Sequence, residues 1–76
     1  MTRLTYKVVR SPGGWAVEYD GRMVCCFKSQ EQAIAEARLL GRTHWEEGGQ
    51  PSRVQVHSTT GLVRTEATFG HERLAG

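Results

Sequence analysis

The chain has 76 residues, of which 38% are hydrophobic, so its length supports one domain around one small core. Ten basic and eight acidic residues leave a formal charge of +2, without the large excess of Lys and Arg that nucleic-acid-binding domains usually carry. No apolar run approaches the roughly 20 residues of a transmembrane helix, and the N-terminus alternates rather than forming the apolar block of a signal peptide. A cytoplasmic protein without membrane contact is expected.

The first part of the chain predicts three antiparallel strands joined by tight turns. Leu4 to Arg10 alternates with period two and is followed by the turn sequence Ser11-Pro12-Gly13-Gly14. Trp15 to Tyr19 alternates in the same way, and Asp20-Gly21 is a strong signal for a type I′ hairpin turn. Arg22 to Phe27 is then the third strand.

One face of these strands is expected to pack in the core. In the third strand both alternating sets are apolar, and we favour Cys25 and Phe27 as the inward residues. Trp15 is expected to pack in the core rather than to bind a partner. The other inward residues are predicted to be Leu4, Tyr6, Val8, Val17 and Tyr19.

A helix is predicted from Ser29 to Glu47. Ser29 is a good N-cap and Gln32 completes a capping box, while Gly48 is expected to be the left-handed C-terminal cap. Leu39 falls off the apolar stripe and is expected to be exposed. The stripe consists of Ala33, Ile34, Ala37, Leu40, Gly41, His44 and Trp45.

The last part predicts a second hairpin. Arg53 to His57 buries Val54 and Val56, and Leu62 to Phe69 follows after a turn at Ser58-Thr59-Thr60-Gly61. In this last strand the inward residues are predicted to be Val63, Thr65, Ala67 and Phe69. The whole is an α+β domain over residues 1–70 with the order β-β-β-α-β-β, one antiparallel sheet covered on one face by a single helix. Residues 71–76 are expected to form a frayed tail.

Short motifs in a fixed order run through most of the chain. They are Tyr6-x-Val8, Gly14-Trp15-x-Val17, Phe27-x-Ser29, Ala33-Ile34-x-x-Ala37, Val54-x-Val56-His57, Gly61 and Phe69-Gly70. On these motifs the chain resembles a family of short bacterial domains, domain-of-unknown-function family 2188, over about Tyr6 to Gly70. The resemblance implies a small α+β architecture and a bacterial origin, and it implies no catalytic residue. Cys25-Cys26 and His44-Trp45 depart from the pattern of that family.

A looser resemblance links the chain to DNA-binding domains built from three strands and one helix, which lay the open face of their sheet in the major groove. It rests on few residues, which equally describe any small sheet covered by a helix. Those residues are Trp15-x-Val17, Gly21, Phe27, Ala33 and Ala37.

No motif for metal binding or catalysis stands out. Structural zinc needs four ligands in paired short spacings, whereas the adjacent Cys25 and Cys26 point to opposite faces of a strand. A nucleophilic pair of Cys26 and His57 would need the third and fourth strands to share a face. We therefore expect a non-enzyme with two reduced thiols, no metal and no cofactor. The potential soft ligands are Cys25, Cys26, His44, His57 and His71.

Two functions remain open from the sequence. The first is a non-catalytic interaction module of uncharacterised role that forms a homodimer through exposed apolar residues, namely Val9, Val24, Leu39 and Leu62; an unidentified protein partner is left open. The second, less favoured, is a nucleic-acid-binding domain that uses the open sheet face through Lys7, Arg22, Arg53 and Arg64. Basic residues clustered on one face would favour the second function, and scattered ones the first.

Overall fold

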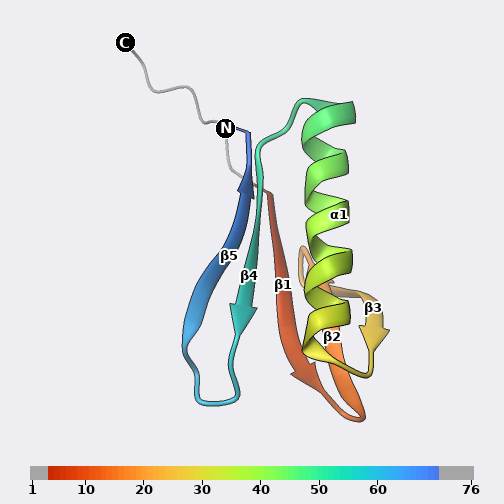
Figure 1. Cartoon of the computed structure of the whole chain (residues 1–76), viewed down its shortest axis with the longest axis vertical. Coiled ribbons are helices and arrows are strands. Elements are labelled where there is room, and N and C mark those ends of the chain that lie inside the picture. Colours follow the sequence, from red (N-terminus) through yellow and green to blue (C-terminus); the bar gives the residue numbers. More distant parts are fainter. Residues whose placement is uncertain (1–3, 71–76) are drawn as a thin grey trace.

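The computed structural model describes residues 4–70, and the predicted tail from His71 onward lies outside these residues. Six elements follow one another in the predicted order β-β-β-α-β-β, which confirms that part of the prediction (Figure 1). They are β1 (Leu4–Ser11), β2 (Gly14–Tyr19), β3 (Arg22–Phe27), α1 (Gln30–Gly48), β4 (Ser52–His57) and β5 (Val63–Phe69).

The sheet is mixed, so the prediction of a purely antiparallel sheet is wrong. Its spatial order is β3-β2-β1-β4-β5, and the first strand of the chain therefore lies in the middle. Three pairings are antiparallel, but β1 and β4 are parallel, with Tyr6 beside Val54 and Val8 beside Val56.

The helix explains this parallel pairing. It has 19 residues, which at about 1.5 Å per residue makes it roughly 28 Å long, enough to carry the chain back along a whole strand. The strand after α1 must therefore start at the same end of the sheet as β3 and run in the same direction. Because β1 is antiparallel to β2 and β2 is antiparallel to β3, β1 and β3 run in the same direction. β4 runs in that direction too, so it is parallel to β1 when it pairs at the free edge of β1.

Both ends of the helix carry caps. The Ser29 hydroxyl accepts a hydrogen bond from the backbone N–H of Gln32 at 3.2 Å, as the capping pattern predicts. At the other end Gly49, with φ of 66°, adopts the left-handed conformation. The predicted cap at Gly48 is thus wrong by one residue, because the helix extends through Gly48 before the chain turns.

The core lies between α1 and the sheet, and small side chains dominate it. Val8, Val17 and Val54 are fully buried, as the alternation predicted. Trp15 is only partly buried at the margin of the core, with the guanidinium of Arg10 5.4 Å from the centre of its ring. The core therefore depends more on the valines than on this tryptophan.

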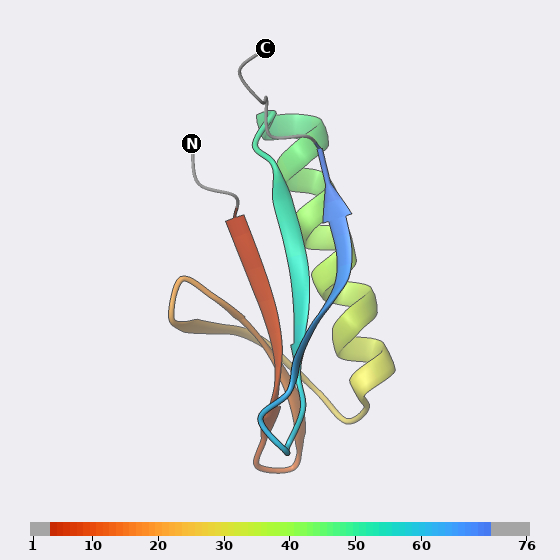
Figure 2. The same ribbon diagram turned by 90° about the vertical axis from the view of Figure 1, so that its left-hand side faces the viewer.

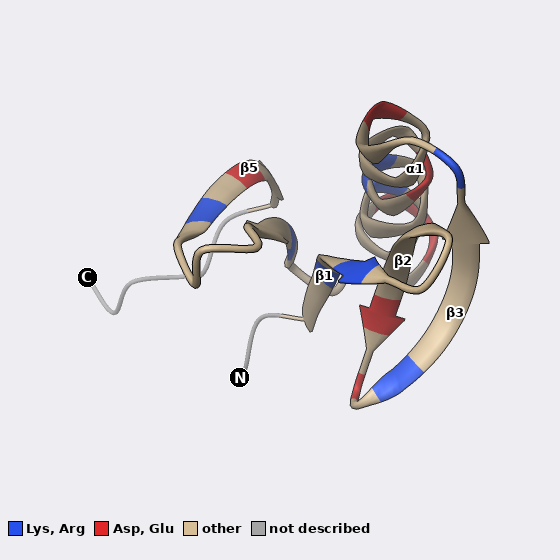
Figure 3. Ribbon diagram, turned by 90° about the horizontal axis from the view of Figure 1, so that it is seen from below, with Lys and Arg blue, Asp and Glu red and all other residues tan. Residues whose placement is uncertain are grey.

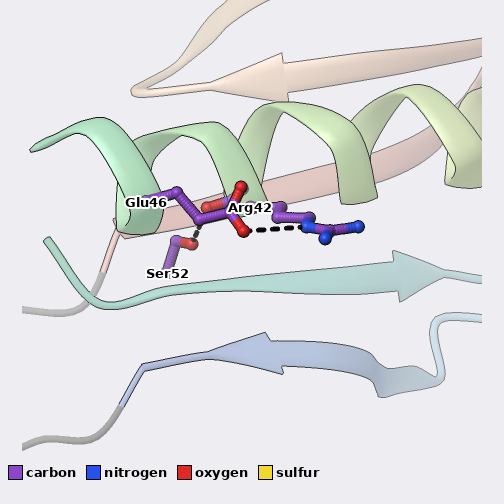
Figure 4. Close-up of polar contacts among 4 residues, drawn as sticks. Arg42, Glu46 and Ser52 are labelled. Carbon is purple, nitrogen blue, oxygen red and sulfur yellow. Dashed lines mark hydrogen bonds and ion pairs between the residues drawn. The ribbon is translucent and has the colours of Figure 1, made fainter. Parts of the chain in front are cut away.

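The helix lies close to the sheet at Gly41. The hydroxyl of Ser52, which is fully buried on β4, donates a hydrogen bond of 2.5 Å to the Gly41 carbonyl (Figure 4). A Cβ at position 41 would lie 3.2 Å from both the Ser52 hydroxyl and the Phe69 ring. On the solvent side of the same turn, Arg42 and Glu46 form an exposed ion pair at 3.2 Å. Glycine at position 41 thus lets α1 lie close to β4.

Strand β5 contains a β-bulge that overturns part of the predicted inward set. Val54 pairs with Ala67 but Gln55 pairs with Thr65, so Glu66 is an extra residue between them. Ala67 and Phe69 face the core as predicted. Val63 and Thr65, in contrast, are exposed and share the far side of the sheet with His57 and Gln55. The prediction that they face inward is wrong because the extra residue reverses the alternation.

Three aromatic rings meet beneath the C-terminal half of α1. Tyr6 stacks on Tyr19 with ring centroids 4.8 Å apart, and His44 meets both rings edge-on. The Tyr6 hydroxyl is 3.0 Å from His44 Nε2, whereas His44 Nδ1 is buried without a hydrogen-bond partner among residues 4–70. Burial raises the pKa of Tyr6 above its ordinary value, and the neighbouring Tyr19 raises it further.

The raised pKa of Tyr6 predicts a loss of stability in alkali. The unfolded chain releases the Tyr6 proton near pH 10, whereas the folded protein retains it, so this contribution is complete below about pH 10 and is lost as the pH rises through the folded-state pKa. In urea unfolding between pH 8 and 11, Tyr6→Phe should lose less stability over this range than the wild type. Tyr19→Phe removes the neighbour that contributes to the raised Tyr6 pKa, so its alkaline loss should lie between those of the wild type and Tyr6→Phe. Equal alkaline losses in the wild type and Tyr6→Phe would refute the assignment.

Candidate functional site

The open face of the sheet is the side that α1 does not cover, and it is available for binding (Figure 2). Alternation along each strand and the observed register decide which side chains it carries. They include Thr5, Lys7 and Val9 of β1, Ala16 and Glu18 of β2, Met23 and Cys26 of β3, Arg53, Gln55 and His57 of β4, and Val63 and Thr65 of β5.

A polar hollow of about 690 Å³ lies at one end of the open face. Within it Arg53 donates a hydrogen bond from Nε to the Thr5 hydroxyl at 3.0 Å. Lys7 lies directly opposite Glu18 in the register of β1 and β2, so both signs of charge are present. The hollow offers hydrogen bonds and charges to a partner. Its lining consists of Leu4, Thr5, Lys7, Glu18, Tyr19, Asp20, Gly21, Arg53 and Gln55.

An apolar row crosses the open face beyond this hollow. His57 pairs with Val63 on one side, and the register of β1 and β4 places Val9 on its other side. Val63 is 51% exposed. His57 Nε2 is buried and has no hydrogen-bond partner in the described part of the chain, residues 4–70. We call these three residues the Val9–Val63 row.

The four apolar residues predicted to form an interaction surface do not lie together. Val9 is on the open face, in the centre of the sheet. Val24, 46% exposed, is on the edge strand β3, whereas Leu62 precedes β5 at the opposite edge, about 19 Å away at four strand spacings. Leu39, 58% exposed as predicted, is on the helix. The structure therefore separates this set into distinct places.

The four basic residues of the nucleic-acid hypothesis are also dispersed. Lys7 and Arg53 share the open face, where Glu18 accompanies them. Arg22 begins β3 beside the hairpin turn. Arg64 pairs in register with Val56, which faces the helix, and forms an ion pair with Glu66 at 3.3 Å. Figure 3 shows acidic positions on β2 and β5 among the basic positions of β1, β3 and β5.

The two thiols face opposite sides of β3, as predicted. Cys25 is opposite Val17 of the core and is partly buried, and Cys26 is opposite Ala16 and is exposed. Cys26 and His57 both lie on the open face, but β2 and β1 separate their strands, about three strand spacings or roughly 14 Å. The structure does not bring this pair together.

Two apolar residues of the open face are exposed although the sequence did not predict it. Met23 is 57% exposed and Val63 is 51% exposed. Each lies beside a register shift, in β3 and β5 respectively. Alternation alone carries no signal for the bulge that reverses which face such a residue occupies.

Among residues 4–70, no three His, Cys, Asp or Glu side chains are grouped so that they could hold a metal ion; His71 lies outside these residues. Within the same part of the chain, α1 is not long and apolar enough to span a membrane. What the open face offers chemically is a surface of mixed charge crossed by a short apolar row.

Comparison with known proteins identifies the family. A family described as an uncharacterised protein conserved in bacteria matches residues 6–69. No curated protein and no solved structure matched the chain. The family match extends from the third residue of β1 to the last residue of β5 and so includes every element of the fold. The chain therefore belongs to the bacterial domain-of-unknown-function family 2188, as the sequence motifs had indicated.

Proposed function

We propose that this protein is a non-catalytic interaction module that forms a weak homodimer through the open face of its sheet. The observation that carries the proposal is that, among residues 4–70, no helix or strand covers one face of the five-stranded sheet. Sheets usually bury at least one face, and a second face with exposed apolar side chains favours contact with another surface. Val63, at 51% exposure, is such a side chain.

The face is a better candidate than the edges of the sheet. Both edge strands, β3 and β5, show a register shift against their neighbours. Bulges twist an edge strand and hinder its pairing with another chain. The edge strand β5 also carries the Arg64–Glu66 ion pair beside its bulge. Edge-to-edge pairing is therefore disfavoured on both sides.

Charge complementarity supports a second copy as the partner. A two-fold contact places the same surface on itself, so a face of one charge would repel its copy. The open face instead carries Lys7 and Arg53 together with Glu18. Rotation about an axis near the centre of the sheet can place a base of one copy against the acid of the other.

The size of the face sets the expected strength. Five strands spaced by about 4.8 Å, with about five residues each at 3.3 Å, make a face of roughly 400 Å². A standard interface buries about 800 Å² on each partner. An interface of this size belongs to the weak, transient class, so the dimer should be weak.

We expect sedimentation equilibrium to show reversible dimerisation as the protein concentration rises from 10 to 500 μM. Val63→Lys should weaken the dimer at least tenfold, because it buries a positive charge without a partner among the apolar side chains of the Val9–Val63 row. The matched control is Leu39→Lys, which adds the same charge on the helix, where Leu39 is 58% exposed. It should leave the dissociation constant unchanged.

Three outcomes contradict the proposal. A wild type that stays a monomer of 8.5 kDa up to 500 μM excludes self-association as the function. Loss of the dimer in Leu39→Lys but not in Val63→Lys places the contact on the helix. Tight binding of duplex or single-stranded oligonucleotides that weakens steeply with salt, and that is lost in Lys7→Ala and Arg53→Ala, supports the nucleic-acid function instead.

A further inference from the structure

The edge strand β3 brings together two sulfur atoms that its sequence spacing would separate. The Sγ atom of Cys26 is 3.0 Å from the Sδ atom of Met23. In a regular strand, residues three apart point to opposite faces. Here Val17 pairs with Cys25 and Glu18 pairs with Met23, so Val24 is an extra residue in β3. This bulge places Met23 and Cys26 on the same side.

We propose that Met23 and Cys26 form a binding site for a soft monovalent metal ion, Cu(I) in particular. A thiolate and a thioether are the ligand types that select Cu(I) over harder cations in proteins. Both side chains are accessible, since Met23 is 57% exposed and Cys26 is exposed. The bulge in β3 is the structural element that assembles the pair.

The chemistry of the site excludes the commoner metal. Structural zinc requires four ligands arranged as a tetrahedron, and no three His, Cys, Asp or Glu side chains of residues 4–70 are grouped to provide them. Cu(I) is held by few soft ligands. On binding, the Cys26 thiol releases its proton to solvent and the thiolate bonds the ion, without any change of oxidation state.

The geometry of the pair allows the ion to enter. Metal–thiolate bonds are about 2.3 Å long, so two such bonds on opposite sides of an ion hold their sulfurs at most about 4.6 Å apart. The sulfurs therefore separate by up to about 1.6 Å from their 3.0 Å contact when the ion lies between them. Methionine has three rotatable bonds and adapts readily, and the exposed Met23 side chain is free to move outward by this amount.

The neighbouring Cys25 is outside the proposed site. It is opposite Val17 on the core side of β3 and is partly buried, so its thiol points away from Cys26. Cys25→Ser is therefore a matched control, because it removes a thiol from the adjacent residue without touching the proposed ligands.

The test is an anaerobic titration of the whole chain with Cu(I) against a chromophoric Cu(I) chelator, at a protein concentration below 10 μM so that the open face is free. The wild type should take up one ion for each chain. Met23→Leu, which conserves the volume of the side chain, should lower the affinity at least tenfold, and Cys26→Ser should abolish binding. Cys25→Ser should bind as the wild type does, and Zn(II) should not compete.

Circular dichroism of each variant first checks that it is folded, and only folded variants are compared. No uptake by the wild type overturns the proposal. An unchanged affinity in Met23→Leu would show that the thioether does not bind the ion, and this result also overturns the proposal. Equal losses in Cys25→Ser and Cys26→Ser would show that both thiols hold the ion in a rearranged strand, which contradicts the site as the bulge builds it.

Discussion

Gly14→Ala should cost the protein a large part of its stability at 25 °C. A Cβ at position 14 would lie 2.1 Å from the carbonyl oxygen of Phe27 and 3.1 Å from the Cα of Lys28. Both are backbone atoms at the end of β3, just before the helix cap, so neither can move without displacing the entry to α1. We expect a loss of at least 3 kcal/mol, against a total of roughly 4–11 kcal/mol for a domain of this size.

Gly13→Ala is the matched control for this prediction. Gly13 has a positive φ of 83°, but a Cβ there would meet no atom of residues 4–70 within 4 Å. It should therefore cost only the strain of a left-handed residue, about 1–2 kcal/mol. Urea unfolding followed by circular dichroism compares the two variants. If Gly14→Ala were as stable as Gly13→Ala, the close approach of β2 to the end of β3 would be wrong.

Val54→Ala is expected to have the second largest effect. Val54 is fully buried on β4, between Tyr6 of β1 and Ala67 of β5. Removing two buried methyl groups forfeits their transfer free energy and leaves a cavity, which together should cost about 2–3 kcal/mol. That is a large part of the stability of so small a domain.

Val63→Ala makes the same chemical change on the open face. Val63 is 51% exposed, and substitutions at exposed positions usually change stability by less than about 0.5 kcal/mol. Both variants are compared by urea unfolding at a concentration where the chain is monomeric. Equal losses in the two would mean that Val63 is buried, and the bulge in β5 would then be misplaced.

The elements of the fold and most of their inward faces were predictable from the sequence. Period-two alternation located the strands, and the serine cap located the start of the helix. The parallel pairing of β1 and β4 could also have been deduced, because a single helix after β3 returns the chain to the end at which β3 and β1 begin. The two predicted hairpins on either side of the helix favoured a purely antiparallel sheet. That interpretation did not take into account the end of the sheet to which the helix returns the chain.

Bulges limited the prediction of the remaining faces. One extra residue, Glu66, moved Val63 and Thr65 to the open face, and another in β3 brought Met23 beside Cys26. A shift of one residue reverses every side chain beyond it, yet no residue type marks where it occurs. The open face itself was predicted, whereas the grouping of its residues depended on these shifts.

The central place of β1 has a consequence for how the chain folds. β1 contains the first described residues, and its partner β4 lies 48 positions further along, where Leu4 pairs with Ser52. During synthesis the first three strands and the helix therefore emerge before the strand that completes the core. Contacts between such distant segments slow folding, because the chain loses entropy when the long loop between them closes. That loss comes before the new contacts can offset it. In a chain that ends within α1, the edge of β1 that pairs with β4 has no partner strand. The last third of the sequence, which contains β4 and β5, therefore completes the sheet to which the first strand belongs.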